Sequence, residues 1–265
     1  MRPVFVRPCI PAEVARPPQG EDWIHEPKFD GYRFQIVKNG REVRFFSKSG
    51  AEYGARLPRM VEAFGDLPAR AAVLDGELVF FDAKGQADFR QLHNQMRTRW
   101  PDEAALVFMV FDLLHQDGID LRGLPLSERK HNLDRLCRKA KVPFLRQVQT
   151  FPDGAVLFAH CAKFGLEGVV SKRIDRPYVS GPTKVWVKSK SPAWRRDNQQ
   201  RFRMCEGSKK KPELTEQQKV LVRKRQELAR VRERLRDPDL RQGLVRELRK
   251  HVAILEREIA ELKQA

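Results

Sequence analysis

The sequence contains little cysteine and no long apolar run. Its four cysteines lie far apart and form no CxxC pair, which argues against a disulfide framework and against a zinc site. The longest apolar run, residues 104–111, spans eight residues, whereas a membrane-spanning helix requires about 20. Three prolines within the first 11 residues leave no apolar segment of the kind that a secretory signal contains. We therefore expect a reduced, cytoplasmic protein without a membrane span.

Acidic residues are too few to balance the basic ones. The chain has 52 Lys and Arg against 35 Asp and Glu, for a formal net charge of +17. A field of this sign attracts polyanions, of which nucleic acid is the commonest. A solvated basic surface gives the same total, so charge alone does not identify a partner. Hydrophobic residues make up 41% of the chain, which is enough for a folded core.

The composition changes near residue 190. Residues 1–190 carry a net charge of +8, and the much shorter remainder carries +9. Residues 191–212 are polar and basic and are predicted to be a linker. In residues 213–265, leucines recur at seven-residue and then at three- and four-residue spacing, which predicts a helical hairpin or coiled coil. Such a tail could pack on itself or on the body, form a dimer seam, or bind a protein partner, and its basic faces could contact DNA.

Residues 1–190 are predicted to form an α+β domain of antiparallel sheets flanked by helices. Asn39-Gly40 between alternating apolar residues is a strong hairpin signal. Further strands are expected over residues 23–26, 73–81, 107–114, 171–173 and 185–190, the first of them ending at Pro27. Helices are expected over residues 89–96, after Ser127 as N-cap, and over residues 155–164.

The densest group of chemically active side chains lies between Glu26 and Arg33. Lys28 stands where a strand is expected to end, just before Asp30-Gly31. A lysine is a nucleophile only when it is unprotonated, so nearby cations or burial must lower its pKa from about 10.4. Taken alone, Lys28 would be read as an exposed turn residue.

A second group of lysines follows near residue 190. Lys188 and Lys190 alternate on one strand, so they face the same side about 6.6 Å apart. Two like charges at this separation require an anion, and a chain of phosphates would meet that need. Glu167 precedes a strand that ends in Lys172, and a carboxylate among lysines suits a bound Mg²⁺ with phosphates.

These groups, taken in order, resemble the nucleotidyltransferase motifs of bacterial ATP-dependent DNA ligases. The motifs are Lys28-x-Asp30-Gly31-x-Arg33, Asp75-Gly76-Glu77, Phe111-Asp112-Leu113-Leu114, Glu167-Gly168-Val169-Val170-Ser171-Lys172 and Trp186-Val187-Lys188-Ser189-Lys190. Residues 124–129 also resemble the segment that follows the adenine-stacking motif in that family. The resemblance covers residues 1–190 and implies the ligase adenylation-domain fold, which is ATP-grasp-like.

The resemblance also implies a reaction. Lys28 would attack the α-phosphate of ATP, expel pyrophosphate and hold AMP as a phosphoramidate. The AMP would pass to a 5′-phosphate at a DNA nick, and a 3′-hydroxyl would displace it, as DNA repair and recombination require. This implies ATP and nicked DNA as partners, association with the nucleoid, and a lowered pKa of Lys28 caused by cationic neighbours and a metal ion.

Roles for the other matched residues come from the same resemblance. Glu26 would read the adenine amino group, Arg33 and Glu77 would hold the ribose, and Phe111 would stack on the base. Lys172, Lys188 and Lys190 would contact phosphates. Lys48 would also bind ATP, but it stands in place of the family's usual arginine and loses its planar fork. Glu167 and Asp30 would hold Mg²⁺ or Mn²⁺.

One departure from the family concerns the residues after Lys190. Family ligases continue with an OB-fold domain that carries an Arg-x-Asp-Lys element, and residues 191–265 contain no such element. Tail cations or a partner would then have to orient pyrophosphate. The departure keeps a different class of function open, namely a binding protein that holds DNA ends or recruits a partner without turnover. RNA ligation or RNA capping shares the same nucleophile, although the fit around residues 25–33 and 124–129 favours DNA.

Overall fold

The computed structural model of the chain describes residues 2–83, 85–98, 101–197 and 242–264, together with isolated positions 220, 224, 227, 228, 231 and 235. The chain divides into two compact units, Met1–Asn198 and Gln199–Ala265. Each unit is described by itself.

The smaller sheet of the first unit has four strands in the order β1 (Cys9–Glu13), β10 (Gly181–Lys190), β9 (Gly168–Arg173) and β2 (Trp23–Lys28). The β10–β9 and β9–β2 pairs are antiparallel, whereas β1 runs parallel to β10. The predicted end of a strand at Pro27 is wrong, because β2 continues through it to Lys28. The strand tolerates this proline because β2 is at the edge of the sheet, where a missing backbone donor breaks no ladder.

The larger sheet contains the predicted hairpin. Its order is β4 (Glu42–Ser47), β3 (Tyr32–Asn39), β5 (Ala71–Phe80), β6 (Leu106–Gln116) and β7 (Ile119–Asp120), and β8 (Leu145–Gln147) pairs with β6. Asn39 faces Glu42 across the turn, and Gly40 adopts the positive φ of 61° that such a turn requires. The expectation of antiparallel sheets holds except at the β1–β10 and β6–β8 pairs, which are parallel.

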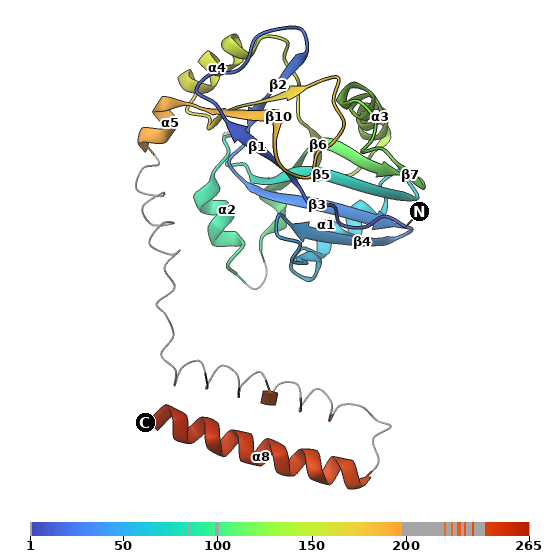
Figure 1. The fold of residues 1–265 in the computed structure, drawn as a ribbon, viewed down its shortest axis with the longest axis vertical. Helices are drawn as coiled ribbons and strands as arrows, with labels where there is room; N and C mark the ends of the chain where they lie inside the picture. The colour runs from blue at the N-terminus through green and yellow to red at the C-terminus, as the bar shows by residue number, and fades with distance from the viewer. Residues whose placement is uncertain are drawn as a thin grey trace. The chain divides into compact units, whose positions relative to one another are not determined.

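Helices cover the two sheets (Figure 1). The α-helices of this unit are α1 (Pro58–Gly65), α2 (Phe89–Gln95), α3 (Leu126–Lys139), α4 (Gly154–Lys163) and α5 (Pro192–Asp197), and two short 3₁₀ helices are η1 (Gly54–Arg56) and η2 (Glu103–Ala105). Helices α1, α2 and α3 contact β4, β5 and β6 of the larger sheet, and α4 contacts β9 and β2 of the smaller one. The main apolar core lies between the larger sheet and its helices.

Helix α3 is fixed to the larger sheet by a buried ion pair. Arg129, near the start of α3, donates from Nε and Nη2 to the two carboxylate oxygens of Asp112 on β6, each at 2.9 Å, and both side chains are 0% exposed. The prediction of Ser127 as N-cap is wrong, because α3 begins at Leu126 and has no side-chain cap. The backbone N–H of Ser127 donates instead to the carbonyl of Ile174, so a neighbouring loop takes the place of the cap.

The described part of the second unit is mainly helix α8 (Gln242–Gln264). Among the side chains of α8 whose burial is described, Leu248 and Leu255, seven residues apart, are buried. Of the leucine repeat predicted between residues 214 and 235, Leu214 and Leu221 lie outside the described residues, whereas Leu228 and Leu235 are partly buried. Among the helical segments that the structure describes, none has the length and apolar character needed to cross a bilayer.

The buried Arg129–Asp112 pair provides a test of the fold. Replacing Asp112 by Asn should lower the free energy of unfolding by about 3–5 kcal/mol, because the Arg129 guanidinium stays buried without a counter-charge. Urea unfolding followed by circular dichroism measures this change. Asp134→Asn is the matched control, since its pair with Arg138 on the same helix is exposed and its loss should cost less than about 1 kcal/mol. Equal losses in the two variants would contradict the assignment.

Candidate active site

A cavity of about 730 Å³ opens between the two sheets, and Lys28 lies in its wall. Lys28 is the last residue of β2 and faces Gly168 on β9. The chain then turns through Gly31, where an added Cβ would overlap the carbonyl oxygen of Leu78 on β5. Gly168 has a φ of +148°, and a Cβ there would overlap the carbonyl oxygen of Ser189. These two close backbone approaches fix the position of Lys28 and explain why both motifs contain glycine.

Lys28 forms an ion pair with Glu167. Its Nζ lies 2.8 Å from Oε2 of Glu167, and the Nζ of Lys190 lies 3.5 Å from Oε1 of the same carboxylate. Burial lowers the pKa of Lys28, but the Glu167 and Glu77 carboxylates outweigh it and the net pKa is raised. The prediction that cationic neighbours lower this pKa is therefore wrong, because the charge nearest to Nζ is a carboxylate.

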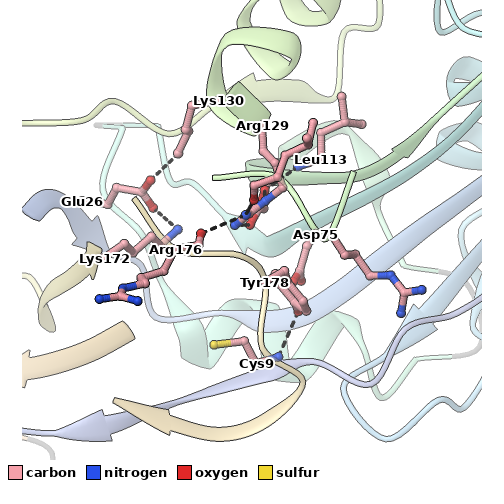
Figure 2. Close-up of polar contacts among 12 residues, drawn as sticks. Cys9, Glu26, Asp75, Leu113, Arg129, Lys130, Lys172, Arg176 and Tyr178 are labelled. Carbon is pink, nitrogen blue, oxygen red and sulfur yellow. Dashed lines mark hydrogen bonds and ion pairs between the residues drawn. The ribbon is translucent and has the colours of Figure 1, made fainter. Parts of the chain in front are cut away.

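At another part of the cavity wall, Glu26 lies between two lysines. Its Oε2 is 2.6 Å from Nζ of Lys172, and its Oε1 pairs with Nζ of Lys130. Figure 2 shows this carboxylate between the two ammonium groups. Glu26 is 2% exposed and Lys172 is 1% exposed, so a lone charge here would be costly and each partner stabilises the other.

Two aromatic rings adjoin this cluster. Phe111 on β6 and Trp186 on β10 both line the cavity and meet edge to face, with ring centroids 5.9 Å apart. The Nζ of Lys172 lies 4.3 Å from the centroid of Phe111 and 4.1 Å from that of Trp186. Burial lowers the pKa of Lys172 to about 8, although the Glu26 carboxylate opposes this shift. Apolar rings beside a polar carboxylate suit a heterocyclic base with a polar edge.

Arg33 on β3 also lines the cavity, and a buried carboxylate holds it in place. Its Nε and Nη2 donate to the two oxygens of Asp75 on β5, at 2.9 and 2.7 Å, and its Nη1 donates to the carbonyl of Cys9 at 3.1 Å. Tyr178 completes the group: its hydroxyl donates to Asp75 at 2.6 Å and accepts from the backbone N–H of Cys9 at 2.9 Å. The Asp75 and Tyr178 ends of this group appear in Figure 2.

Glu77, directly opposite Arg33 in the β3–β5 ladder, lines the cavity as well. Burial raises its pKa to about 7, while the positive charges of Lys28 and Arg33 oppose the shift. Near neutral pH, this carboxyl is therefore divided between its acid form, which donates a hydrogen bond, and its carboxylate form, which accepts one.

The remaining predicted cations border the same region. Lys48, in the turn after β4, lines the cavity beside Ser47 and Ser49 and is exposed. Lys188 lines it from β10, 3.9 Å from a carboxylate oxygen of Glu13, and its pKa is lowered by burial and then by Lys190. Lys188 and Lys190, the two lysines predicted to face the same side of one strand, thus each have a carboxylate partner, Glu13 and Glu167 respectively.

Glu167 and Asp30 both lie close enough to Lys28 to raise its pKa. Within the ranges that the structure describes, no group of three or more His, Cys, Asp or Glu side chains could hold a metal ion. Mg²⁺ commonly binds through one or two carboxylates, with phosphates and water as its other ligands. The two acids thus fit a site that a nucleotide completes.

Sequence reasoning missed Lys130 and Tyr178. Lys130 stands at the fifth residue of a helix, where a basic residue is ordinarily solvated, and Tyr178 lies in the loop between β9 and β10. Tyr178 supplies the hydroxyl that, with the Arg33 guanidinium, partners the buried Asp75 carboxylate. Lys130 directly follows the segment 124–129, which resembles a family motif and ends with the buried Arg129. That resemblance was a usable signal that this part of α3 approaches the cavity.

The cavity combines a lysine that has a carboxylate partner with an aromatic wall and several cations. These groups suit the base and the phosphates of a nucleotide, so the class is that of nucleotide-binding proteins. The comparisons with known proteins narrow the class. Residues 7–190 match the ATP dependent DNA ligase domain, and the chain belongs to that family.

Curated relatives are DNA ligases. The multifunctional non-homologous end joining protein LigD of Pseudomonas aeruginosa is 34% identical over 189 residues, which are 71% of this chain and 22% of that protein. A probable DNA ligase of Beutenbergia cavernae is 38% identical over 199 residues, 72% of this chain and 38% of that protein. The chain thus spans well under half the length of these relatives.

Solved structures give the same result. The ligase domain of Mycobacterium tuberculosis LigD superposes with a TM-score of 0.61 at 33% identity, covering 69% of this chain and 58% of that one. A mycobacterial DNA ligase D complexed with ATP and MES has a TM-score of 0.61 at 32% identity and covers 69% of this chain and 59% of that one. The fold of the first unit is therefore that of ligase domains.

The Lys28–Glu167 pair generates a test of the site. Glu167→Gln should lower the pKa of Lys28, because it removes the carboxylate that most strongly raises that pKa. The pH dependence of Lys28 labelling by trinitrobenzenesulfonate, read by peptide mass spectrometry, should shift to lower pH. Glu128→Gln, at an exposed position on α3, should leave the profile unchanged. An unchanged or higher midpoint in Glu167→Gln would refute the proposed coupling.

Proposed function

We propose that the amine of Lys28 attacks the α-phosphate of ATP, releases pyrophosphate and forms a covalent lysyl-AMP, and that this AMP then passes to a 5′-phosphate at a DNA nick. The observation that carries the proposal is the placement of Lys28 in the wall of a cavity that also presents Glu26, Phe111, Lys172 and Lys188. An amine nucleophile, a base-sized apolar wall and phosphate-binding cations are the groups that nucleotidyl transfer needs. Membership in the ATP dependent DNA ligase domain family supports it.

The base would lie against Phe111 with its amino group toward Glu26. Both residues line the cavity, and an ionised carboxylate accepts hydrogen bonds from an exocyclic amine. Arg33 and Glu77, which face each other across the β3–β5 ladder, would hold the ribose, whose hydroxyls donate and accept. The bidentate pair with Asp75 keeps Arg33 fixed, so the ribose end meets a preorganised site.

The phosphates would lie among Lys48, Lys172, Lys188 and Lys190. These cations stabilise the charge that spreads over the transferring phosphoryl group. In the free protein, Lys188 and Lys190 are paired with Glu13 and Glu167. Phosphate oxygens would replace these carboxylates as partners, so the lysines would exchange one anion for another rather than become newly charged.

Lys28 attacks only as the neutral amine, and its raised pKa keeps it protonated in the free protein. Nucleotide binding must therefore loosen its pair with Glu167 and remove a proton from Nζ. Glu167 and Asp30 are the residues that would hold Mg²⁺ or Mn²⁺. When bound, the ion supplies positive charge to the phosphates. If the Glu167 carboxylate holds the metal ion, it raises the pKa of Lys28 less than when it pairs with Lys28 alone. The neutral amine is then favoured.

The product step acts on DNA. The 3′-hydroxyl at the nick would displace AMP from the activated 5′-phosphate and seal the strand, a reaction that repair and recombination require. Two matched relatives are described as an end joining protein and a probable DNA ligase. The net charge of +17 supports DNA as the polyanion and association with the nucleoid.

We also propose that residues 1–190 form the adenylation domain, residues 191–212 a linker whose start is folded as α5 of the first unit, and residues 213–265 a helical hairpin. Ion pairs between Lys224 and Glu258 at 2.8 Å and between His251 and Glu227 at 3.2 Å support the hairpin, because they join α8 to positions upstream of it. Such a tail would add DNA affinity, and it could dimerise or bind a protein partner through its leucine faces.

The central test of this function is self-adenylation. Incubation with α-labelled ATP and Mg²⁺, followed by a denaturing gel, should label the wild-type chain. Lys28→Ala should abolish the label, because the amine that forms the phosphoramidate is gone. Mass spectrometry should place AMP on the peptide that contains Lys28. Lys141→Ala, at an exposed position, is the control and should label normally. AMP on a different lysine would overturn the assignment.

The tail has its own test. A chain that ends at Pro212 should still adenylate Lys28 but bind nicked DNA more weakly, because it lacks the basic residues that bind phosphates. Every phosphate that is no longer neutralised should lower the salt slope of binding by about 0.9. Fluorescence anisotropy over a range of salt concentrations measures both the affinity and the slope. Abolished adenylation with unchanged DNA binding would show instead that the tail serves the first chemical step.

A further inference from the structure

Glu26 is held by a lysine that lies outside the cavity. Glu26 and Lys172 line the cavity wall, whereas Lys130 is absent from that lining and approaches Glu26 from α3. The Lys130 ammonium therefore touches the carboxylate that faces the nucleotide without touching the nucleotide itself. Figure 2 shows Lys130 and Lys172 on different sides of Glu26.

The position of Lys130 is rigid. The adjacent Arg129 is 0% exposed and binds both oxygens of Asp112, and it also donates to the carbonyl of Leu124 at 2.7 Å. This anchors the first turns of α3 next to Phe111, the residue before Asp112. The helix dipole disfavours a cation near the N-terminal end of a helix. The ion pair with Glu26 offsets this unfavourable electrostatic energy of Lys130.

Glu26 takes its counter-charge from two lysines rather than from Lys172 alone. The pKa of Lys172 is lowered to about 8, mainly by burial and in part by the positive charge of Lys130, while the Glu26 carboxylate opposes the shift. Near neutral pH most of Lys172 still carries its charge, and that charge is fully buried. Lys130, whose side chain keeps 12% of its surface in solvent, supplies the second positive charge that keeps Glu26 ionised in a buried site.

We propose that Lys130 is a positioning residue that holds Glu26 as an ionised acceptor, so that the cavity selects 6-aminopurine nucleotides over 6-oxopurine nucleotides. This inference rests on the proposed function, and it names Lys130 as a residue that determines the substrate selectivity of that function. A carboxylate accepts from the 6-amino group of adenine and repels the 6-oxo group of guanine. A carboxyl that could rotate or take up a proton would offer a donor to the 6-oxo group, and discrimination would fall.

The test is equilibrium binding of nucleotides that cannot transfer AMP. Titration calorimetry would use the α,β-methylene analogues of ATP, GTP and purine riboside triphosphate, the last of which has neither group at position 6. We expect wild-type protein to bind the GTP analogue about 100-fold more weakly than the ATP analogue. Lys130→Met should weaken ATP-analogue binding about 10-fold, narrow the gap to GTP, and leave purine riboside binding nearly unchanged.

Two further variants separate positioning from structure. Lys130→Arg keeps the charge and should retain most of the preference for the ATP analogue. Lys139→Met, at an exposed position on the same helix, should match the wild type. Equal loss for all three analogues in Lys130→Met, or no loss at all, would overturn the proposal. If Lys130→Met fails to fold, the inference rests on Lys130→Arg, and a loss of preference there with normal purine riboside binding would also overturn it.

The binding measurement is independent of the covalent step. Wild-type protein that binds the ATP analogue selectively but forms no lysyl-AMP would refute the proposed function and leave the role of Lys130 intact. Lysyl-AMP formation in a protein whose base selectivity does not depend on Lys130 would refute only the inference.

Discussion

The fully buried carboxylate of Asp75 is the point at which the two sheets are tied together. It lies on β5 of the larger sheet and binds Arg33 and Tyr178, which in turn bind the backbone of Cys9 on β1 of the smaller sheet. A buried carboxylate without partners would cost several kcal/mol, so these contacts restrict how the two sheets can be placed. The cavity between the sheets keeps its shape because its floor is a network in which each charge has a partner.

Charges near Lys28 are likewise paired with charges of opposite sign. Glu167 is a partner of both Lys28 and Lys190, so one carboxylate stabilises two cations. The same carboxylate raises the pKa of Lys28 and keeps its amine protonated. If Lys28 is the nucleophile that we propose, stability and reactivity make opposite demands on Glu167, and phosphates that take Lys190 as a partner would ease the conflict.

Sequence patterns predicted the α+β class, the Asn39-Gly40 hairpin and the family, because short-range turn chemistry and ordered motifs are local signals. They failed where tertiary packing decides. Pro27 stays in β2 because that strand is at an edge, and Ser127 is no cap because a distant loop satisfies its backbone. Most of the predicted site residues line one cavity, whereas Asp30, Glu167 and Lys190 are not part of its lining and are linked to it through their charges near Lys28. The direction of the pKa shift of Lys28 depends on which charge is nearest in space. Lys130 was missed for the same reason, since its carboxylate partner lies 104 positions away in the chain.

Cys9 illustrates what burial does to a side chain that borders the cavity. Burial raises the pKa of its thiol to about 12, and the thiols of Cys137 and Cys161 are raised to about 11 for the same reason. A thiol reacts as its thiolate, so maleimides and similar alkylating agents should find no reactive group in the nucleotide cavity at neutral pH. Covalent inhibitors of such a site therefore cannot rely on its thiol.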